Sequence, residues 1–203
     1  SGPLSITVTV FGEVPAGEAL RRAGARAGDL VCVSGTPGDA ALGLERWLAG
    51  NHDRHDPAIL RLLRPTPRLA LGVELRGVAT AGIDVSDGLL GDLAHIVAES
   101  SRATGMALGA ELQLAALPRS PSLAALADEA ALEHQLAGGD DYELCFTVPV
   151  QSLAALRVAA ASAQVPVAVI GRITDDGRIR CLDTDGREWQ PRRRGWDHFA
   201  NEE

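Results

Sequence analysis

Strand-like and helix-like segments follow each other in irregular order along this chain, and this order limits the folds open to it. Apolar strands, several rich in β-branched residues, are predicted at residues 30–33, 79–84, 142–148 and 165–170. Neither an internal repeat nor a long linker divides the sequence. A regular doubly wound fold needs strands and helices in strict alternation. The irregular pattern therefore predicts an α+β fold, with a mixed sheet covered by helices.

Helices are predicted where apolar residues recur every three or four positions. In residues 89–104, Leu89, Leu93, Ile96 and Val97 fall on one face, which is typical of a helix packed on a sheet. Further elements are expected as helices at 40–49, 120–127, 129–137 and 151–163, a helical stretch at 56–76 broken by Pro65 and Pro67, a strand at 106–114, and a hairpin turning at Asp185 and Gly186.

Residues 4–14 have the clearest strand pattern, because apolar and polar residues alternate and many are β-branched. Alternation places the apolar side chains on one face, so this segment predicts a half-buried strand. The chain begins at Ser1 without an initiator Met. We therefore expect it to be processed or to be part of a longer protein.

Composition argues against several classes of protein. The net charge is −8, from 19 basic and 27 acidic residues, so no broad attraction to nucleic acid or to anionic membranes is expected. Three cysteines without CxxC spacing disfavour a disulfide framework or a zinc knuckle and fit a reducing cytosol. No apolar run approaches the roughly 18 residues of a membrane span, and no signal-peptide pattern precedes the first strand. These features predict a cytoplasmic location.

The most concentrated polar motif runs from Asp84 to Gly88, where a predicted strand meets a predicted helix. One interpretation is a helix N-cap by Ser86 or Asp87 followed by a turn glycine. The other is a metal site, because Asp84 and Asp87 place two carboxylates at a helix N-terminus, where anions also bind. Mg²⁺ binds through one or two carboxylates together with substrate phosphates. This motif is therefore the candidate Mg²⁺ site.

Two further loops carry candidate residues. Residues 138–143 read Gly-Gly-Asp-Asp-Tyr-Glu, which taken alone predicts a glycine C-cap followed by a solvated acidic turn. Residues 34–39 lie between a strand and a helix, as phosphate-binding loops do. They lack the lysine of a P-loop, so we interpret them as structural.

Arginines and aromatic residues offer two more possibilities. Arg21 and Arg22 follow the first predicted strand and are either ordinary surface arginines or a phosphate clamp. Residues 192–199 place three arginines beside Trp196 and Phe199. This tail is either a basic terminus that docks an aromatic side chain on the core or an aromatic wall for a flat ligand.

Taken together, these motifs resemble the thiamine-monophosphate kinase family. The matching segments occur in the family's order and span almost the whole chain. Residues 84–88 alone suit several relatives in the same ATP-binding superfamily, which includes aminoimidazole ribonucleotide synthetase and selenophosphate synthetase. Residues 138–143 combined with 195–199 resemble this kinase specifically. The full set of matching segments is 2–4 with the following strand, 34–39, 83–89, 138–146 and 195–199.

The resemblance implies an ATP-dependent phosphorylation of thiamine monophosphate to thiamine diphosphate, with Mg²⁺ as cofactor. It implies that Asp84 and Asp87 bind Mg²⁺, and that Ser86 and Arg22 contact ATP. No residue is assigned as a catalytic acid or base. The attacking group is a phosphate oxygen, which is already deprotonated near neutral pH, so alignment and charge neutralisation suffice.

The same resemblance implies that Asp140, where the family often has Glu, and Trp196 contact the thiamine substrate. It implies a three-layer mixed fold, with residues 1–203 forming the C-terminal domain of the superfamily. A preceding domain would carry most of the Mg²⁺-binding aspartates, and the full-length protein would be a homodimer.

Two other functions remain open at this point. One is a sibling ATP-dependent synthetase of the same superfamily, and the other is a non-catalytic domain that binds a small molecule. The carboxylate pair Asp84 and Asp87 favours an enzyme, because a pure binding module needs no divalent metal.

Overall fold

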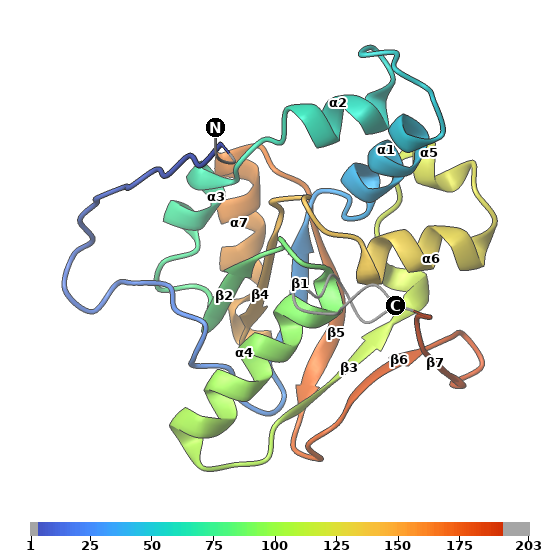
Figure 1. Cartoon of the computed structure of the whole chain (residues 1–203). Coiled ribbons are helices and arrows are strands. Elements are labelled where there is room, and N and C mark those ends of the chain that lie inside the picture. The colour runs from blue at the N-terminus through green and yellow to red at the C-terminus, as the bar shows by residue number, and fades with distance from the viewer. Residues whose placement is uncertain (1–3, 193–203) are drawn as a thin grey trace.

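The computed structural model describes residues 4–192, which contain a seven-stranded sheet (Figure 1). The strand order is β2-β4-β1-β5-β3-β6-β7. β3 and β6 pair in parallel, whereas the other neighbours pair antiparallel, so the predicted mixed sheet is confirmed. The strands are β1 (Leu30–Ser34), β2 (Ala81–Asp84), β3 (Gly109–Gln113), β4 (Leu144–Val148), β5 (Val167–Thr174), β6 (Ile179–Leu182) and β7 (Glu188–Trp189).

Helices cover both faces of the sheet and make three layers. α4 and α6 pack on one face, α3 and α7 pack on the other, and α1 packs against α2 beyond one end of the strands (Figure 1). Within residues 4–192, none of the helices combines the length and apolar composition needed to cross a bilayer. The helices are α1 (Asp39–Leu48), α2 (Pro57–Leu63), α3 (Leu69–Glu74), α4 (Leu89–Thr104), α5 (Pro121–Ala124), α6 (Asp128–Ala137) and α7 (Leu153–Ala163), with 3-10 turns at Leu114–Ala116 and Val150–Ser152.

The alternation of side chains along the central strands builds two cores. In β1, Val31 and Val33 face α4 and α6, whereas Cys32 faces α3 and α7. In β4, Cys145 faces α4 and α6, whereas Phe146 faces α3 and α7. Burial raises the pKa of the Cys32 thiol to about 12, so this group is a packing residue and not a nucleophile.

Most predicted elements are confirmed within a few residues. The helix predicted at 89–104 is α4, and the helical stretch at 56–76 is broken into α2 and α3 around its two prolines. The strand predicted from residue 142 begins instead at Leu144. Tyr142 has a φ of 51°, which is incompatible with an extended strand.

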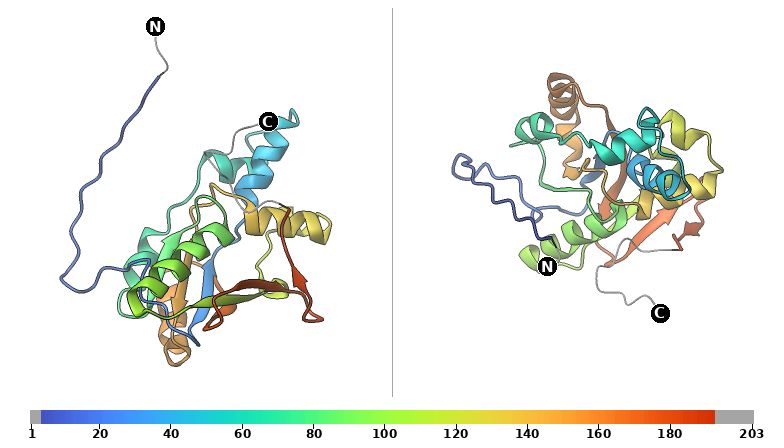
Figure 2. Two further views of the ribbon diagram at one scale, coloured as in Figure 1. Left: turned by 60° about the horizontal axis from the view of Figure 1, so that its bottom comes forward. Right: turned by 45° about the horizontal axis from the view of Figure 1, so that its top comes forward.

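The strand prediction for residues 4–14 is wrong. These residues form no strand in the described structure and run as an extended segment outside the body (Figure 2). Val10 is 85% exposed and Phe11 is 91% exposed. A strand needs a partner backbone, and the neighbouring edge of β2 is already covered, because the Gly82 N–H donates to the Arg21 carbonyl at 2.9 Å.

Candidate functional site

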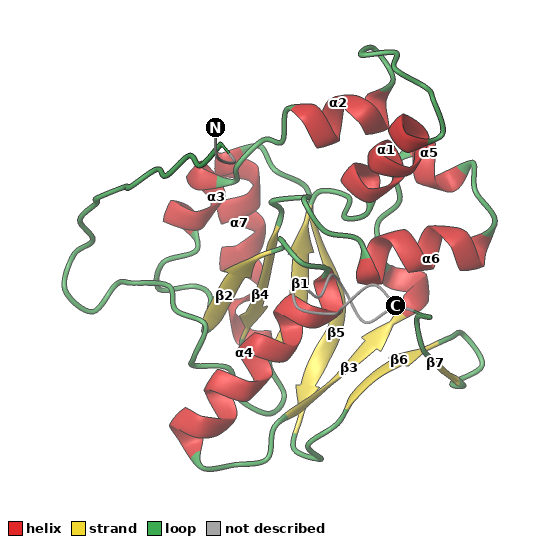
Figure 3. Ribbon diagram, in the orientation of Figure 1, coloured by secondary structure: helices red, strands yellow, loops and turns green. Residues whose placement is uncertain are grey.

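The sheet topology brings the loops of interest to one end of the molecule. β1 and β2 both pair antiparallel with β4, so β1 and β2 end where β4 begins. Ser34 ends β1, Asp84 ends β2, and Leu144 starts β4. The loops that follow or precede these residues lie together at this end (Figure 3).

The motif that begins at Asp84 connects β2 to α4. The Asp84 side chain is exposed, Ser86 and Asp87 are partly buried, and Gly88 is the N-cap residue of α4 with a φ of 118°. No side chain caps this helix, so the predicted cap by Ser86 or Asp87 is wrong.

The buried carboxylate of Asp92, in the first turn of α4, holds this loop instead. Its Oδ2 accepts hydrogen bonds from the backbone N–H groups of Ser86 at 2.9 Å and Asp87 at 3.2 Å. Burial raises the Asp92 pKa, and the nearby charges of Asp87 and Asp84 raise it further. The sequence analysis missed this residue, although an acid in the first turn of a helix is a signal that could have identified it.

The second acidic motif lies directly against the first. The N–H of Asp140 donates to the Ser86 carbonyl at 2.9 Å, and the N–H of Tyr142 donates to the Val85 carbonyl at 2.9 Å. A Cβ atom at Gly139 would lie 2.3 Å from the Ser86 carbonyl oxygen, so only glycine permits this approach. The backbone therefore brings together two motifs that are more than fifty residues apart in the sequence.

Exposed carboxylates gather where the two motifs meet. Asp84 and Asp140 are exposed, and Asp87 is partly buried. The pKa of the Tyr142 hydroxyl is raised by burial, then by the charges of Asp140, Asp84 and Asp87. The charges of these three acids all act on one tyrosine, and we call Asp84, Asp87 and Asp140 the acidic patch.

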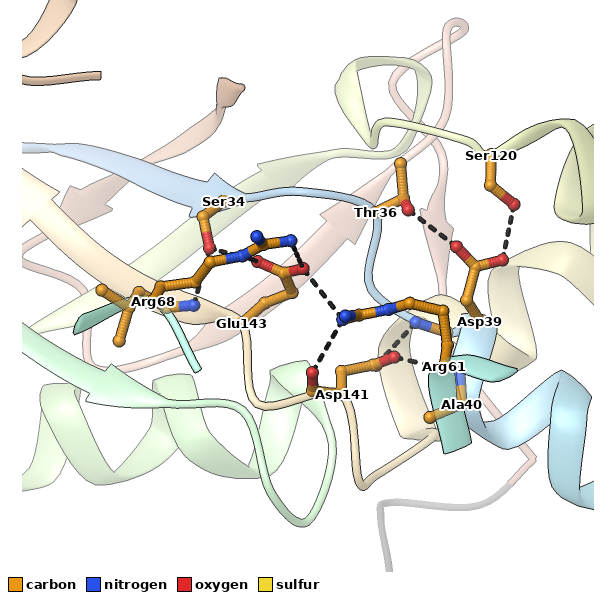
Figure 4. Close-up of polar contacts among 11 residues, drawn as sticks. Ser34, Thr36, Asp39, Ala40, Arg61, Arg68, Ser120, Asp141 and Glu143 are labelled. Atoms are coloured by element: carbon orange, nitrogen blue, oxygen red, sulfur yellow. Dashed lines mark hydrogen bonds and ion pairs between the residues drawn. The ribbon is translucent and has the colours of Figure 1, made fainter. Parts of the chain in front are cut away.

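The other two acids of the second motif are buried, so the predicted solvated acidic turn is wrong in this part (Figure 4). Asp141 is 0% exposed and accepts hydrogen bonds from the N–H groups of Gly38 at 2.6 Å and Ala40 at 3.2 Å. It therefore anchors the start of α1. The loop at 34–39 wraps around this carboxylate, which agrees with its interpretation as a structural loop.

Glu143 is also buried and lies in a cage of donors. Arg68 donates to both of its carboxylate oxygens, at 2.7 and 2.6 Å, and Arg61 donates to Oε1 at 2.9 Å. The Ser34 hydroxyl donates to Oε2 at 2.5 Å. The sequence analysis did not identify these arginines, because no local pattern links them to a residue 75 or 82 positions away.

The other two predicted site residues, Arg22 and Trp196, have no described contacts at this site. Arg22 is exposed on the segment beside β2, and its side chain makes no hydrogen bond or ion pair with the described residues. Trp196 lies outside the described residues. Within residues 4–192, no group of three or more His, Cys, Asp or Glu side chains forms a metal site. The carboxylates of Asp84 and Asp87 are of the chemical type that binds Mg²⁺ together with substrate phosphates.

Comparison with known proteins places this geometry in a family. A curated relative, the thiamine-monophosphate kinase of Escherichia coli, is 45% identical over 204 residues, which cover 98% of this chain and 61% of that protein. The crystal structure of thiamine-monophosphate kinase from Stenotrophomonas maltophilia is 42% identical, with a TM-score of 0.76 over 87% of this chain and 56% of that one. The chain therefore spans less than two thirds of the length of these relatives.

A third similar protein is the structure described as "AaThiL complexed with AMPPCP and TMP". It is 31% identical, with a TM-score of 0.68 over 89% of this chain and 54% of that one. The three-layer mixed fold agrees with the fold that the sequence resemblance implies. The family described as AIR synthase related protein, C-terminal domain, matches residues 26–183. On this match, which covers most of its length, the chain belongs to the family of AIR synthase related proteins as a C-terminal domain.

Proposed function

We propose that this chain is the C-terminal part of a kinase that transfers a phosphoryl group from ATP to thiamine monophosphate, giving thiamine diphosphate. The observation that carries the proposal is 45% identity, over 98% of the chain, to a protein with this activity in its name. A second similar protein was solved with AMPPCP and TMP. The acidic patch supports the same function, because a kinase needs hard oxygen ligands beside its nucleotide.

In this proposal Asp84 and Asp87 hold Mg²⁺, while Ser86 and Arg22 contact ATP. The bound metal supplies charge neutralisation for the phosphate groups. Asp92 keeps the loop in place by accepting hydrogen bonds from the backbone N–H groups of Ser86 and Asp87. The exposed guanidinium of Arg22 has no competing partner among residues 4–192 and is free to meet a phosphate.

Asp140 and Trp196 are proposed to contact thiamine monophosphate. The thiamine ring system carries a permanent positive charge, which an exposed carboxylate attracts. Asp140 lies beside the metal-binding loop, because its N–H donates to the Ser86 carbonyl. The acceptor phosphate is largely ionised near neutral pH, since its second pKa is about 6, and it needs no general base. Positioning is therefore the main task of these residues.

We also propose that a preceding domain completes the site. The two aspartates of this chain are too few to neutralise a nucleotide and an acceptor phosphate together. The alternating apolar side chains of residues 4–14 are exposed. A segment with this pattern forms a stable strand only when it pairs with and packs on another element. The full-length protein is proposed to be a cytoplasmic homodimer, with residues 1–203 as its C-terminal domain.

The test is the formation of thiamine diphosphate under saturating ATP and Mg²⁺. The full-length protein should turn over, whereas the 203-residue chain alone should not, because only part of the metal site lies in this chain. Turnover by the chain alone at the rate of the full-length protein would show that the site is complete without the preceding domain.

A thermal-shift panel separates the kinase from the two other functions. Thiamine monophosphate should raise the melting temperature of the full-length protein, and Mg²⁺ with ATP should raise it further. Stabilisation by precursors of aminoimidazole ribonucleotide, and not by thiamine monophosphate, would indicate a sibling synthetase. Stabilisation by a small molecule without any response to Mg²⁺ and ATP would indicate a non-catalytic binding domain.

A further inference from the structure

The cage around Glu143 is more elaborate than a stability argument requires. The side chain is 1% exposed and receives hydrogen bonds from two guanidinium groups and one hydroxyl. Replacing a buried ion pair by well-packed apolar residues is often neutral or stabilising. A buried ion pair instead fixes the orientation of its side chains, because bidentate hydrogen bonds set the angle between the two groups as well as the distance. The cage therefore points to a requirement for a fixed geometry nearby.

The backbone that needs a fixed geometry lies immediately before Glu143. Asp140 has a φ of 63° and Tyr142 a φ of 51°, so two of three consecutive residues adopt the left-handed conformation without being glycine. Such residues persist only where the surrounding structure holds them, and they cluster at ligand sites. The strained segment is thus anchored at one end by Glu143.

The strained segment also sets the position of the metal-binding loop. The carbonyl of Glu143 accepts a hydrogen bond from the Val85 N–H at 2.7 Å, and Tyr142 and Asp140 donate to the carbonyls of Val85 and Ser86. A shift of Glu143 would therefore move the Asp140 carboxylate and the loop beside it together.

The arginines connect this segment to another part of the chain. Arg61 lies on α2 and Arg68 is the N-cap residue of α3, so both come from the region between β1 and β2. Arg61 also donates to the Asp141 carbonyl at 2.9 Å, inside the strained segment itself. A Cβ atom at Gly35 would lie 2.2 Å from Glu143 Oε1, so the loop after β1 closes the cage on its other side.

We propose that Glu143, Arg61 and Arg68 form a positioning clamp that holds the strained segment 140–142 against the loop at 84–87 and so places the Asp140 carboxylate. The role of Asp140 in binding the acceptor rests on the proposed function. The clamp itself does not touch the substrate. It acts through the backbone of the residues that do.

The experiment compares Arg68→Gln with a matched control in the full-length protein. Arg180→Gln is the control, because Arg180 is 28% exposed, against 19% for Arg68, and pairs with Glu111 and Asp176 on the far side of the sheet. Arg68→Lys is the conservative variant, which keeps the charge but loses the bidentate geometry. Circular dichroism establishes that each variant is folded.

Two readouts are measured. Hydrogen exchange of the Asp140 and Tyr142 amides should be about tenfold faster in Arg68→Gln than in wild type and unchanged in Arg180→Gln. The KM for thiamine monophosphate should rise roughly tenfold in Arg68→Gln, with the KM for ATP and kcat changed less than about twofold. Arg68→Lys should lie between Arg68→Gln and wild type in both readouts.

The outcomes separate the clamp from the proposed function. Unchanged exchange at Asp140 and Tyr142 in Arg68→Gln overturns the clamp, and so does faster exchange with an unchanged KM for thiamine monophosphate in an active kinase. A wild-type protein that does not phosphorylate thiamine monophosphate overturns the proposed function instead, and the exchange rates then still decide whether the clamp holds the segment.

Discussion

Asp140 and Asp141 are neighbours in the sequence, but their environments are opposite. Asp140 is exposed in a patch with Asp84 and Asp87, whereas Asp141 is fully buried and accepts two backbone hydrogen bonds at the start of α1. One peptide bond therefore separates an acid available to ligands from an acid committed to the fold.

This difference shows that neighbouring acidic residues in a sequence can have separate roles, one at the surface and one in the core. Burial and partners, and not sequence proximity, decide which carboxylates are available. Asp84 and Asp140 are exposed, so substituting either of them should cost the fold little. The buried acids Asp141 and Glu143 hold the surrounding loops, and removing them should affect stability first.

The largest expected effect separates the two regions by activity. If Asp87 holds Mg²⁺ as proposed, Asp87→Asn in the full-length protein should lower the rate of thiamine diphosphate formation by roughly a thousandfold, because a metal ligand is then lost where transition-state charge is neutralised. The melting temperature should stay close to that of wild type. Normal activity of this variant at low Mg²⁺ would exclude a metal-binding role for Asp87.

The second prediction concerns the buried region. Glu143→Ala should lower the free energy of unfolding by about 3–5 kcal/mol, because it leaves the two guanidinium groups of Arg61 and Arg68 without their buried partner. Denaturant titration measures this loss. Asp128→Ala, which removes the exposed partner of Arg119, is the control and should cost far less. Equal losses in the two variants would mean that the cage contributes no more than a surface pair.

The third prediction uses pH to distinguish the two neighbouring aspartates. Burial raises the pKa of Asp141 to about 7, whereas the unfolded chain ionises near pH 4. The contribution of Asp141 to stability is therefore fully present below about pH 4 and is lost as the pH rises towards 7. The slope in the free energy of unfolding is at most about 1.4 kcal/mol per pH unit.

Asp141→Asn should make this slope clearly shallower between about pH 4 and 7, and the part due to the raised pKa of Asp92 should remain, whereas Asp140→Asn should leave the slope unchanged. Denaturant titrations at several pH values measure both. A wild-type stability that rises with pH across this window, or a slope as steep in Asp141→Asn as in wild type, would show that Asp141 is not the group responsible.

Local sequence patterns predicted the elements that have a continuous apolar run or a regular apolar spacing. β1 and α4 follow directly from an apolar run and from the spacing of Leu89, Leu93 and Ile96. The strand at residues 4–14 failed for a physical reason. The apolar and polar residues alternate, but no described neighbour of this chain buries the apolar side chains.

The sequence pointed to the candidate aspartates but not to the buried contacts behind them. The aspartates at 84 and 87 stand in one motif, and their proximity to each other is a property of the sequence. The pairing of Glu143 with Arg61 and Arg68 depends on the sheet bringing α2, α3 and β4 to one end, which no local pattern encodes. The left-handed φ angles before Glu143 have the same origin, because only tertiary contacts sustain such strain.

The smallest expected effect is that of Asp140→Asn on stability, and it is the sharpest test of the comparison. The substitution removes a charge from an exposed side chain whose only described side-chain hydrogen bond is a long one from the Tyr142 hydroxyl, at 3.4 Å. Asparagine tolerates the φ of 63° as well as aspartate does. The free energy of unfolding should therefore change by less than about 0.5 kcal/mol. Under the proposed function, the KM for thiamine monophosphate should nevertheless rise in the full-length protein, because a carboxylate that would attract the cationic ring is lost. A loss of stability comparable to that of Asp141→Asn would mean that the two aspartates belong to one structural unit, and that exposure does not separate them.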